Sequence, residues 1–93
     1  MTQKQKPIII IGGGVSGLSA AKRLKEAGVP IILLEGRDRL GGRAHTVDIA
    51  GNQASWVELG PFWIEDHLTN PAYHLLRDIG AQVHQIDIGP STL

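Results

Sequence analysis

The feature that most constrains the fold is a short apolar run that ends in a glycine-rich turn. Four isoleucines, Ile8–Ile11, are followed by the sequence Gly-Gly-Gly-Val-Ser-Gly at residues 12–17. An apolar run of this length is typical of a buried parallel strand and is too short for a helix or a membrane span. Gly12, Gly14 and Gly17 have the spacing G-x-G-x-x-G. This spacing predicts a strand that turns tightly into a helix.

The residues after the turn complete a βαβ unit. From Val15 to Gly28 apolar residues recur every three positions, which predicts an amphipathic helix that Gly28 ends as a left-handed cap. Residues 30–34 predict a second buried strand, and Glu35 stands at its end, eighteen residues after Gly17. The predicted fold class is therefore α/β, a Rossmann-like βαβ dinucleotide-binding unit. With 93 residues in the chain, it is expected to be incomplete as a domain.

Each part of this unit has its own role in binding a dinucleotide. Gly12 permits the tight turn, Gly14 has no side chain to hold a pyrophosphate away, and Gly17 lets the helix pack close to the strand. The helix N-terminus presents N–H groups and the positive end of its dipole to phosphates. The carboxylate of Glu35 can accept hydrogen bonds from both hydroxyls of a ribose. A glycine turn without a ligand is the alternative, and the position of Glu35 favours a binding site.

Composition limits the classes of function. Nine basic residues balance nine acidic ones, so no net charge favours nucleic acid or an anionic membrane. The sequence has no cysteine, which excludes disulfides, thiolate metal sites and cysteinyl attachment of a cofactor within it. His67 and His74 lack the spacing of a helical metal pair, and no metal site is expected. We expect a cytoplasmic protein with no membrane span, no signal peptide and disordered residues 1–6.

The second half of the chain predicts a hairpin and a helix. Residues 45–49 and 54–59 read as two strands about a Gly-Asn turn. Asn70 is a predicted N-cap before a helix over residues 71–79, and Gly80 is its predicted C-cap.

The remaining segments are less regular. At least one of Phe62 and Trp63 is expected to pack in a core, because aromatic side chains dominate buried contact area. Residues 83–88 suggest a further strand, and residues 89–93 follow it without a capping pattern. Residues 1–93 are therefore interpreted as the N-terminal segment of a longer protein.

Three stretches of the sequence carry a resemblance to one family. Residues 34–43, Leu-Glu-Gly-Arg-Asp-Arg-Leu-Gly-Gly-Arg, resemble the N-terminal signature of the flavin-containing amine oxidases, which include monoamine, polyamine and L-amino-acid oxidases. Residues 56–64, Trp-Val-Glu-Leu-Gly-Pro-Phe-Trp-Ile, are similar to the second glycine motif of that family, and residues 70–80 resemble the helix that follows it. The family pattern usually has a glycine where this chain has Pro61, which carries no backbone N–H.

The resemblance implies FAD as the cofactor in place of a nicotinamide dinucleotide. It places the pyrophosphate at the first glycine motif, the adenosine ribose at Glu35, and the phosphates and ribityl chain near Arg43. A guanidinium also pairs with phosphate through two parallel hydrogen bonds. The implied cofactor-binding residues are Gly12, Gly14, Val15, Ser16, Gly17, Glu35, Gly36, Arg37, Gly42, Arg43, Gly60, Pro61 and Phe62.

Three functions follow as hypotheses. The first is the FAD-binding part of a flavin-dependent amine or amino-acid oxidase, which oxidises a C–N bond of a small-molecule amine by hydride transfer to flavin. Its partner would be the remainder of the same protein or a second chain. The alternatives are a fragment of an NAD-dependent dehydrogenase and a non-catalytic nucleotide-binding or interaction module. No catalytic residue is assigned, because a bound flavin would carry the redox chemistry.

Overall fold

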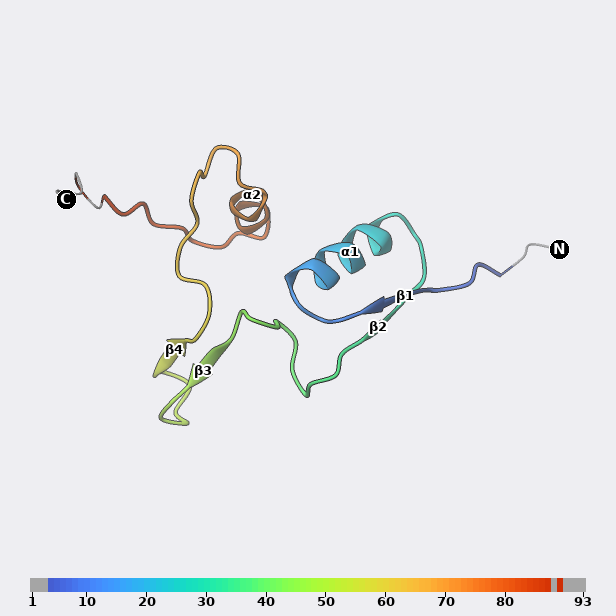
Figure 1. Cartoon of the computed structure of the whole chain (residues 1–93), viewed down its shortest axis with the longest axis horizontal. Helices are drawn as coiled ribbons and strands as arrows, with labels where there is room; N and C mark the ends of the chain where they lie inside the picture. The colour runs from blue at the N-terminus through green and yellow to red at the C-terminus, as the bar shows by residue number, and fades with distance from the viewer. Residues whose placement is uncertain (1–3, 88, 90–93) are drawn as a thin grey trace. The chain divides into compact units, whose positions relative to one another are not determined.

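The computed structural model describes residues 4–87 and 89 and divides the chain into two units (Figure 1). The first unit comprises Met1–Phe62 and the second Trp63–Leu93. Lys4, Gln5 and Lys6 lie outside helices and strands and are exposed, whereas residues 1–3 lie outside the described residues. No helix in the described part of the chain is long and apolar enough to cross a membrane.

The first unit begins with the predicted βαβ arrangement. Strand β1 (Ile8–Ile11), helix α1 (Val15–Glu26) and strand β2 (Ile31–Leu34) follow in order, and α1 packs against both strands (Figure 1). The strands pair in parallel, with Ile8 opposite Ile31 and Ile11 opposite Leu34. Gly28 has the predicted left-handed conformation, with φ 75°. The Rossmann-like prediction is confirmed in the order of the elements and in the parallel direction of the strands.

The burial predicted for the two strands is not reached within this chain. Ala21 on α1 is the buried hydrophobic residue of the described part, whereas Ile9, Ile11 and Leu34 are exposed. Ile11 has 86% of its surface accessible. One helix covers one face of a two-stranded sheet, and a parallel sheet needs cover on both. This agrees with the expectation that the unit is incomplete as a domain.

A hairpin follows the βαβ arrangement and also belongs to the first unit. Strands β3 (Thr46–Asp48) and β4 (Trp56–Glu58) are antiparallel, with Thr46 opposite Glu58. Both are shorter than predicted. The Asp48 carboxylate accepts hydrogen bonds from the N–H groups of Gln53 at 2.5 Å and Ala50 at 3.3 Å, and these bonds shape the loop between the strands.

The second unit contains helix α2 (Pro71–Asp78), which begins at the predicted residue and ends one residue before the predicted end, with Ile79 as its C-cap. The Asn70 side chain accepts from the Ala72 N–H at 2.9 Å, and Pro71 occupies the first turn. Gly80 has φ 76° and its N–H donates to the Arg77 carbonyl at 3.0 Å. Capping signals are local, and the predicted helix is therefore confirmed.

Two predictions about the less regular segments are wrong for the described residues. Residues 81–87 form no strand, since no other described strand pairs with them, and Ile88 and residues 90–93 lie outside the described part. Phe62 and Trp63 are 69% and 66% exposed, so neither packs in a core within this chain. Pairing and burial depend on distant residues, which a local pattern does not specify.

Candidate dinucleotide-binding site

The glycine turn brings the start of α1 against the end of β1. Gly12 has φ 102°, and its N–H donates to the Leu34 carbonyl at 2.7 Å, so the turn is attached to the end of β2. A Cβ atom on Gly17 would lie 1.8 Å from the Gly12 carbonyl oxygen. Any side chain at residue 17 would therefore push α1 away from the turn.

Gly14 has a different environment from Gly17. A Cβ atom there would meet nothing nearer than the Gly42 Cα atom, at 3.9 Å. Its backbone has φ −80° and ψ −172°, a conformation open to any residue. The fold itself therefore tolerates a side chain at Gly14. The glycine leaves an open approach to the backbone, which a closely bound pyrophosphate requires.

Helix α1 begins without a side-chain cap. Gly14 is the N-cap residue, no side chain bonds to the first N–H groups, and the first turn holds no acidic residue. Val15 and Ser16 are exposed at this end. An uncapped helix N-terminus that faces open space favours an anion, through its N–H groups and its dipole.

Glu35 lies at the end of β2, where its carboxylate is held by two backbone groups. Its Oε1 accepts from the Gly13 N–H at 2.9 Å and its Oε2 from the Arg37 N–H at 2.7 Å. These bonds, the Arg37 one first, hold the pKa of Glu35 below its ordinary value of 4.5. The carboxylate is therefore ionised at neutral pH. Each oxygen keeps a further lone pair, so ribose hydroxyls can still donate to it.

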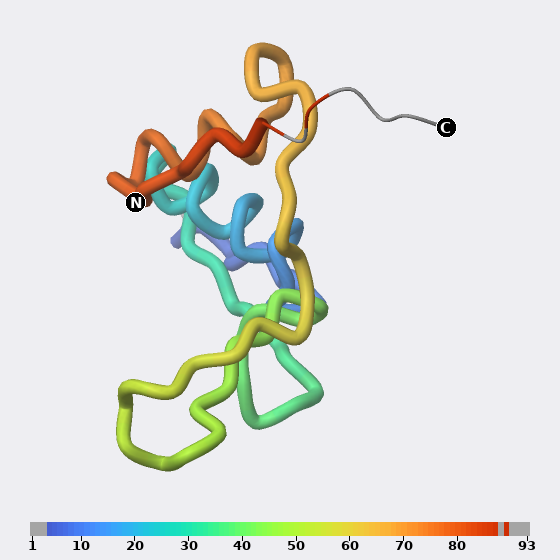
Figure 2. The backbone as a smooth tube through the Cα atoms, turned by 90° about the vertical axis from the view of Figure 1, so that its left-hand side faces the viewer, coloured from blue at the N-terminus to red at the C-terminus, as the bar shows by residue number. Residues whose placement is uncertain are grey.

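The loop after Glu35 returns to the glycine turn, as the backbone in Figure 2 shows. The Gly41 N–H donates to the Gly13 carbonyl at 2.8 Å, and Arg39 Nη1 donates to the Gly42 carbonyl at 2.9 Å. Gly41 and Gly42 have φ 107° and 61°. A Cβ atom on Gly41 would also lie 2.4 Å from the carbonyl oxygen of Ala44. Residue 41 therefore requires glycine for two reasons, its positive φ and the lack of space for a side chain.

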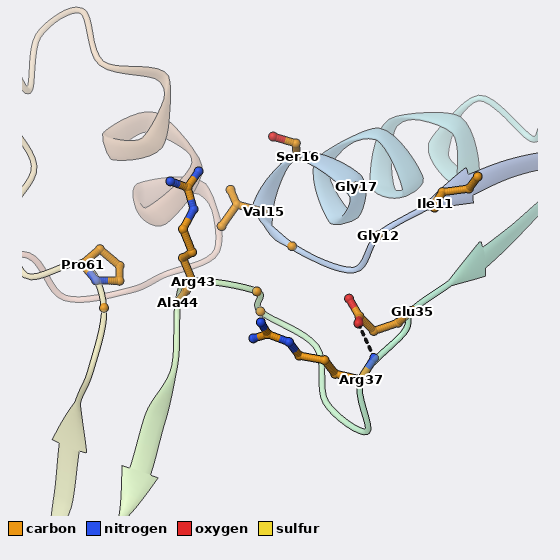
Figure 3. A pocket seen from close by; sticks show the side chains of 14 residues that line it. Ile11, Gly12, Val15, Ser16, Gly17, Glu35, Arg37, Arg43, Ala44 and Pro61 are labelled. Atoms are coloured by element: carbon orange, nitrogen blue, oxygen red, sulfur yellow. Dashed lines mark hydrogen bonds between the residues drawn. The ribbon is translucent and has the colours of Figure 1, made fainter.

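These elements enclose an open cleft of about 710 Å³ within the first unit (Figure 3). It brings together eleven of the thirteen predicted residues: Gly12, Gly14, Val15, Ser16, Gly17, Glu35, Arg37, Gly42, Arg43, Gly60 and Pro61. Gly36 and Phe62 do not line it, and both are exposed. Ile11, Gly41 and Ala44 line it although they were not predicted. The sequence signal for Gly41 was its place in the Gly-Gly pair.

Two arginines give the cleft positive charge. Arg37 and Arg43 both line it, and Figure 3 shows the Arg43 side chain extending toward Val15 at the start of α1. The ion pairs of the described residues are Lys22–Glu26 and Arg77–Asp78. Neither cleft arginine therefore forms an ion pair with a carboxylate in this part of the chain, although the charge of Arg37 helps to lower the pKa of Glu35. Both guanidinium groups can pair with phosphate oxygens.

The cleft fits the phosphates and ribose of a dinucleotide. It combines a glycine backbone open to close approach, an uncapped helix N-terminus, two guanidinium groups and an ionised acceptor at the end of β2. The described residues contain no group of three or more histidine, aspartate or glutamate side chains that could hold a metal ion. Fold and cleft together define the nucleotide-binding βαβ segment of a dinucleotide-dependent protein.

Comparison with known proteins identifies the family. The family model described as flavin containing amine oxidoreductase matches residues 15–92. The chain therefore belongs to the flavin-containing amine oxidoreductase family. FAD as the cofactor, predicted from the resemblance, is confirmed at the level of this family.

Individual relatives carry several different activities in their names. The chain is 53% identical to a flavin-containing amine oxidase of Oncorhynchus mykiss over 80 residues, 86% of this chain and 15% of the relative. It is 40% identical to lysine-specific histone demethylase 1 homolog 2 of Oryza sativa subsp. japonica, over 85% of this chain and 10% of the relative. The structure of wild-type putrescine oxidase bound to putrescine matches 83% of this chain with a TM-score of 0.67 and 37% identity, over 16% of its own length. The chain thus spans between a tenth and a sixth of these proteins.

Proposed function

We propose that this segment holds the ADP half of FAD in a flavoprotein that oxidises a small-molecule amine. The remainder of the same protein, or a second chain, would supply the rest of the flavin enclosure and the substrate pocket. The supporting observation is the cleft in which the N-terminus of α1, Glu35 and Arg43 meet. Family membership supports the chemistry.

Different residues of the cleft would contact different parts of the cofactor. The first-turn N–H groups of α1 and the Gly14 backbone would face the pyrophosphate, with Arg43 as its positively charged partner. Glu35, already oriented by the N–H groups of Gly13 and Arg37, would accept from the adenosine ribose. Bound FAD would supply the redox chemistry of C–N oxidation, and these residues would fix its position.

Pro61 would limit the contacts at the other end of the cleft. It lines the cleft beside Gly60, and it has no N–H to donate. A hydrogen bond from this backbone position to the flavin is therefore impossible. Gly60 and Pro61 would contact the flavin side of the cofactor through van der Waals packing and their carbonyl oxygens.

The two alternative functions are less well supported. A nicotinamide-dependent dehydrogenase would be compatible with the βαβ unit and with Glu35, whose charge would disfavour a 2′-phosphate. The match to the flavin-containing amine oxidoreductase family favours an FAD-dependent oxidase over the dehydrogenase. A non-catalytic nucleotide-binding or interaction module is compatible with the cleft and with the exposed apolar strands, and the family match favours the oxidase over it.

The absorption spectrum of the purified full-length protein tests the proposal. Bands in the near ultraviolet and the blue are expected, together with release of FAD on denaturation. Oxygen consumption with monoamines, polyamines and amino acids would then define the substrate. A folded protein that lacks these bands and instead binds NADH, measured as a change in NADH fluorescence, would overturn the proposal in favour of the dehydrogenase. A folded protein that binds neither cofactor would favour the non-catalytic module.

A cytoplasmic location is also proposed. The absence of cysteine is compatible with a reducing compartment. Fluorescence microscopy of the tagged full-length protein tests this, and a signal confined to an organelle would contradict it.

A further inference from the structure

Glu58 does not line the cleft, yet its carboxylate binds three donors at the end of the hairpin nearest to it. Oε1 accepts from the His45 N–H at 3.1 Å and from the Gly60 N–H at 2.8 Å. Oε2 accepts from the hydroxyl of Thr46. His45 and Thr46 belong to one side of the hairpin and Gly60 to the other, so one side chain joins the two.

The carboxylate is ionised in this position. The Thr46 hydroxyl first, and then the N–H groups of Gly60 and His45, hold the pKa of Glu58 below its ordinary value, against an opposing effect of burial. Hydrogen bonds to a charged acceptor are shorter and stronger than those between neutral groups. Glu58 is therefore a strong local attachment point for the residues that donate to it.

Gly60, in turn, packs directly on the backbone of Arg43. A Cβ atom on Gly60 would lie 2.0 Å from the Arg43 carbonyl oxygen and 3.1 Å from Glu58 Oε1. The Leu59 N–H donates to the His45 carbonyl at 2.8 Å and closes the same end of the hairpin. Gly60 thus lies close against the main chain of Arg43, and its own N–H is held by Glu58.

The residues held in this way present their side chains to the cleft. Figure 3 shows Arg43 and Pro61 at the ends of the two hairpin strands that reach the cleft, and both residues line the cleft. A shift of Gly60 would therefore move both walls of this end. A long arginine side chain amplifies a small change in backbone position at its guanidinium.

We propose that Glu58 is a positioning residue for dinucleotide binding. It fixes Gly60 against the Arg43 carbonyl and so directs the Arg43 guanidinium into the cleft. The inference rests on the proposed function, because it takes Arg43 as a partner of the FAD phosphates. Glu58 itself would not touch the cofactor.

The same hairpin offers a matched control at its other end. Asp48 also accepts hydrogen bonds from two backbone N–H groups, those of Ala50 and Gln53, and it does not line the cleft. Asp48→Ala therefore removes the same kind of interaction from the same hairpin. A general loss of hairpin stability would appear in both variants, whereas a loss of positioning would appear only in Glu58→Ala.

The first experiment is a double-mutant cycle for FAD affinity in the full-length protein. Arg43→Ala and Glu58→Ala are each expected to weaken binding about tenfold or more, and the loss in the double variant should be clearly smaller than the sum of the two single losses. Asp48→Ala should bind as tightly as the wild type. Glu58→Gln should also bind normally, because its amide oxygen can accept from Gly60 and His45 while its NH₂ donates to Thr46. Independent, additive effects of Glu58 and Arg43 would overturn the proposal.

The second experiment needs no cofactor. Hydrogen exchange of the full-length apoprotein, followed by mass spectrometry, should show faster exchange over residues 43–47 and 57–61 in Glu58→Ala and not in Asp48→Ala. Unchanged exchange there would overturn the proposal. If Glu58→Ala does not accumulate, Glu58→Asp, which is one methylene shorter, should show the same dependence on Arg43. A wild-type protein that binds no FAD refutes the proposed function and the role of Glu58 with it, whereas additive effects in a protein that binds FAD refute the role of Glu58 alone.

Discussion

At the scale of single residues, two glycines of one motif are required for different reasons. Gly17 has no space for a Cβ atom, which would lie 1.8 Å from the Gly12 carbonyl oxygen, whereas a Cβ atom on Gly14 would have its nearest neighbour at 3.9 Å. The sequence motif assigns both glycines to a nucleotide site without separating the two reasons. Gly17 serves the fold, and Gly14 leaves room for a ligand.

The two substitutions are therefore expected to fail differently in the full-length protein. Gly14→Val should fold, with a melting temperature close to the wild type, and purify without FAD. Gly17→Val should lower the free energy of unfolding by about 1–3 kcal/mol or more, the usual cost of overpacking, because backbone atoms cannot move aside easily. Thermal unfolding and flavin absorbance per protein measure the two effects. Full flavin occupancy in Gly14→Val would show that the pyrophosphate lies elsewhere.

Glu35 is the residue on which recognition of the adenosine ribose is predicted to depend. Its carboxylate is fixed by the N–H groups of Gly13 and Arg37, so little freedom remains to be lost when a ribose binds. Glu35→Ala should weaken FAD binding by about tenfold to a hundredfold, as expected for loss of a charged acceptor. Glu35→Gln, which keeps one acceptor oxygen, should have a smaller effect. Titration of the apoprotein with FAD measures both, and an unchanged affinity in Glu35→Ala would refute the assignment.

Two carboxylates of the first unit, those of Glu35 and Glu58, predict a dependence of stability on acid. The pKa values of Glu35 and Glu58 are both lowered from 4.5 in the folded state. A lowered folded pKa contributes stability above the unfolded value and loses it as the pH falls through the folded value. Unfolding by urea should therefore become easier below about pH 4.5, and less steeply so in Glu35→Gln and Glu58→Gln. An equal pH dependence in the wild type and both variants would contradict this.

At the scale of elements, the loop over residues 36–43 separates the roles of its three arginines. Arg37 and Arg43 line the cleft. Arg39 instead donates from Nη1 to the Gly42 carbonyl at 2.9 Å and so holds the glycine pair that turns the loop back. A loop of mixed charges would by itself be read as solvated, and the half-buried Arg39 shows that one member has an internal partner.

Arg39→Ala should consequently weaken FAD binding although Arg39 does not line the cleft. The expected loss is about threefold to tenfold, since one hydrogen bond to a charged donor is removed while the loop keeps the bond from Gly41 to Gly13. Arg23→Ala, a change at an exposed arginine of α1, is the matched control and should have no effect. Equal affinities of the Arg39 and Arg23 variants would contradict a role for Arg39 in shaping the loop.

The elements that the sequence predicts well are those whose signals are local. The glycine motif, the apolar stripe of α1 and the cap of α2 each lie within a few residues of the structure that they specify. The hydrogen bonds from Gly13 to Glu35 and from His45 to Glu58 were not predicted, because they join residues that are 22 and 13 positions apart in the sequence. Likewise, the predicted strand over residues 83–88 had a suitable pattern in its described part, but no described strand pairs with it.

At the scale of the whole molecule, the first unit has secondary structure without a core of its own. Ala21 is its buried hydrophobic residue, whereas Ile8, Ile9, Ile32 and Leu34 in the parallel pair are exposed. Parallel strands are stable when covered on both faces, and exposed apolar patches of this kind mark contacts with other polypeptide. The need for further polypeptide to cover the parallel strands follows from the sequence, because residues 1–93 supply too few helices to cover both faces.

The chain of residues 1–93 is therefore predicted not to act as a catalyst by itself. Expressed alone, it should aggregate or purify without flavin, because the apolar strands lack cover and the cleft is open. Flavin absorbance measures cofactor content, amine-dependent oxygen consumption measures catalysis, and solution mass measures aggregation. Co-expression with the remaining sequence should restore solubility and FAD binding, whereas co-expression with an unrelated protein should not. A soluble monomer of residues 1–93 that retains FAD and oxidises an amine would contradict the prediction, since it would show that the parallel sheet needs no cover from further sequence.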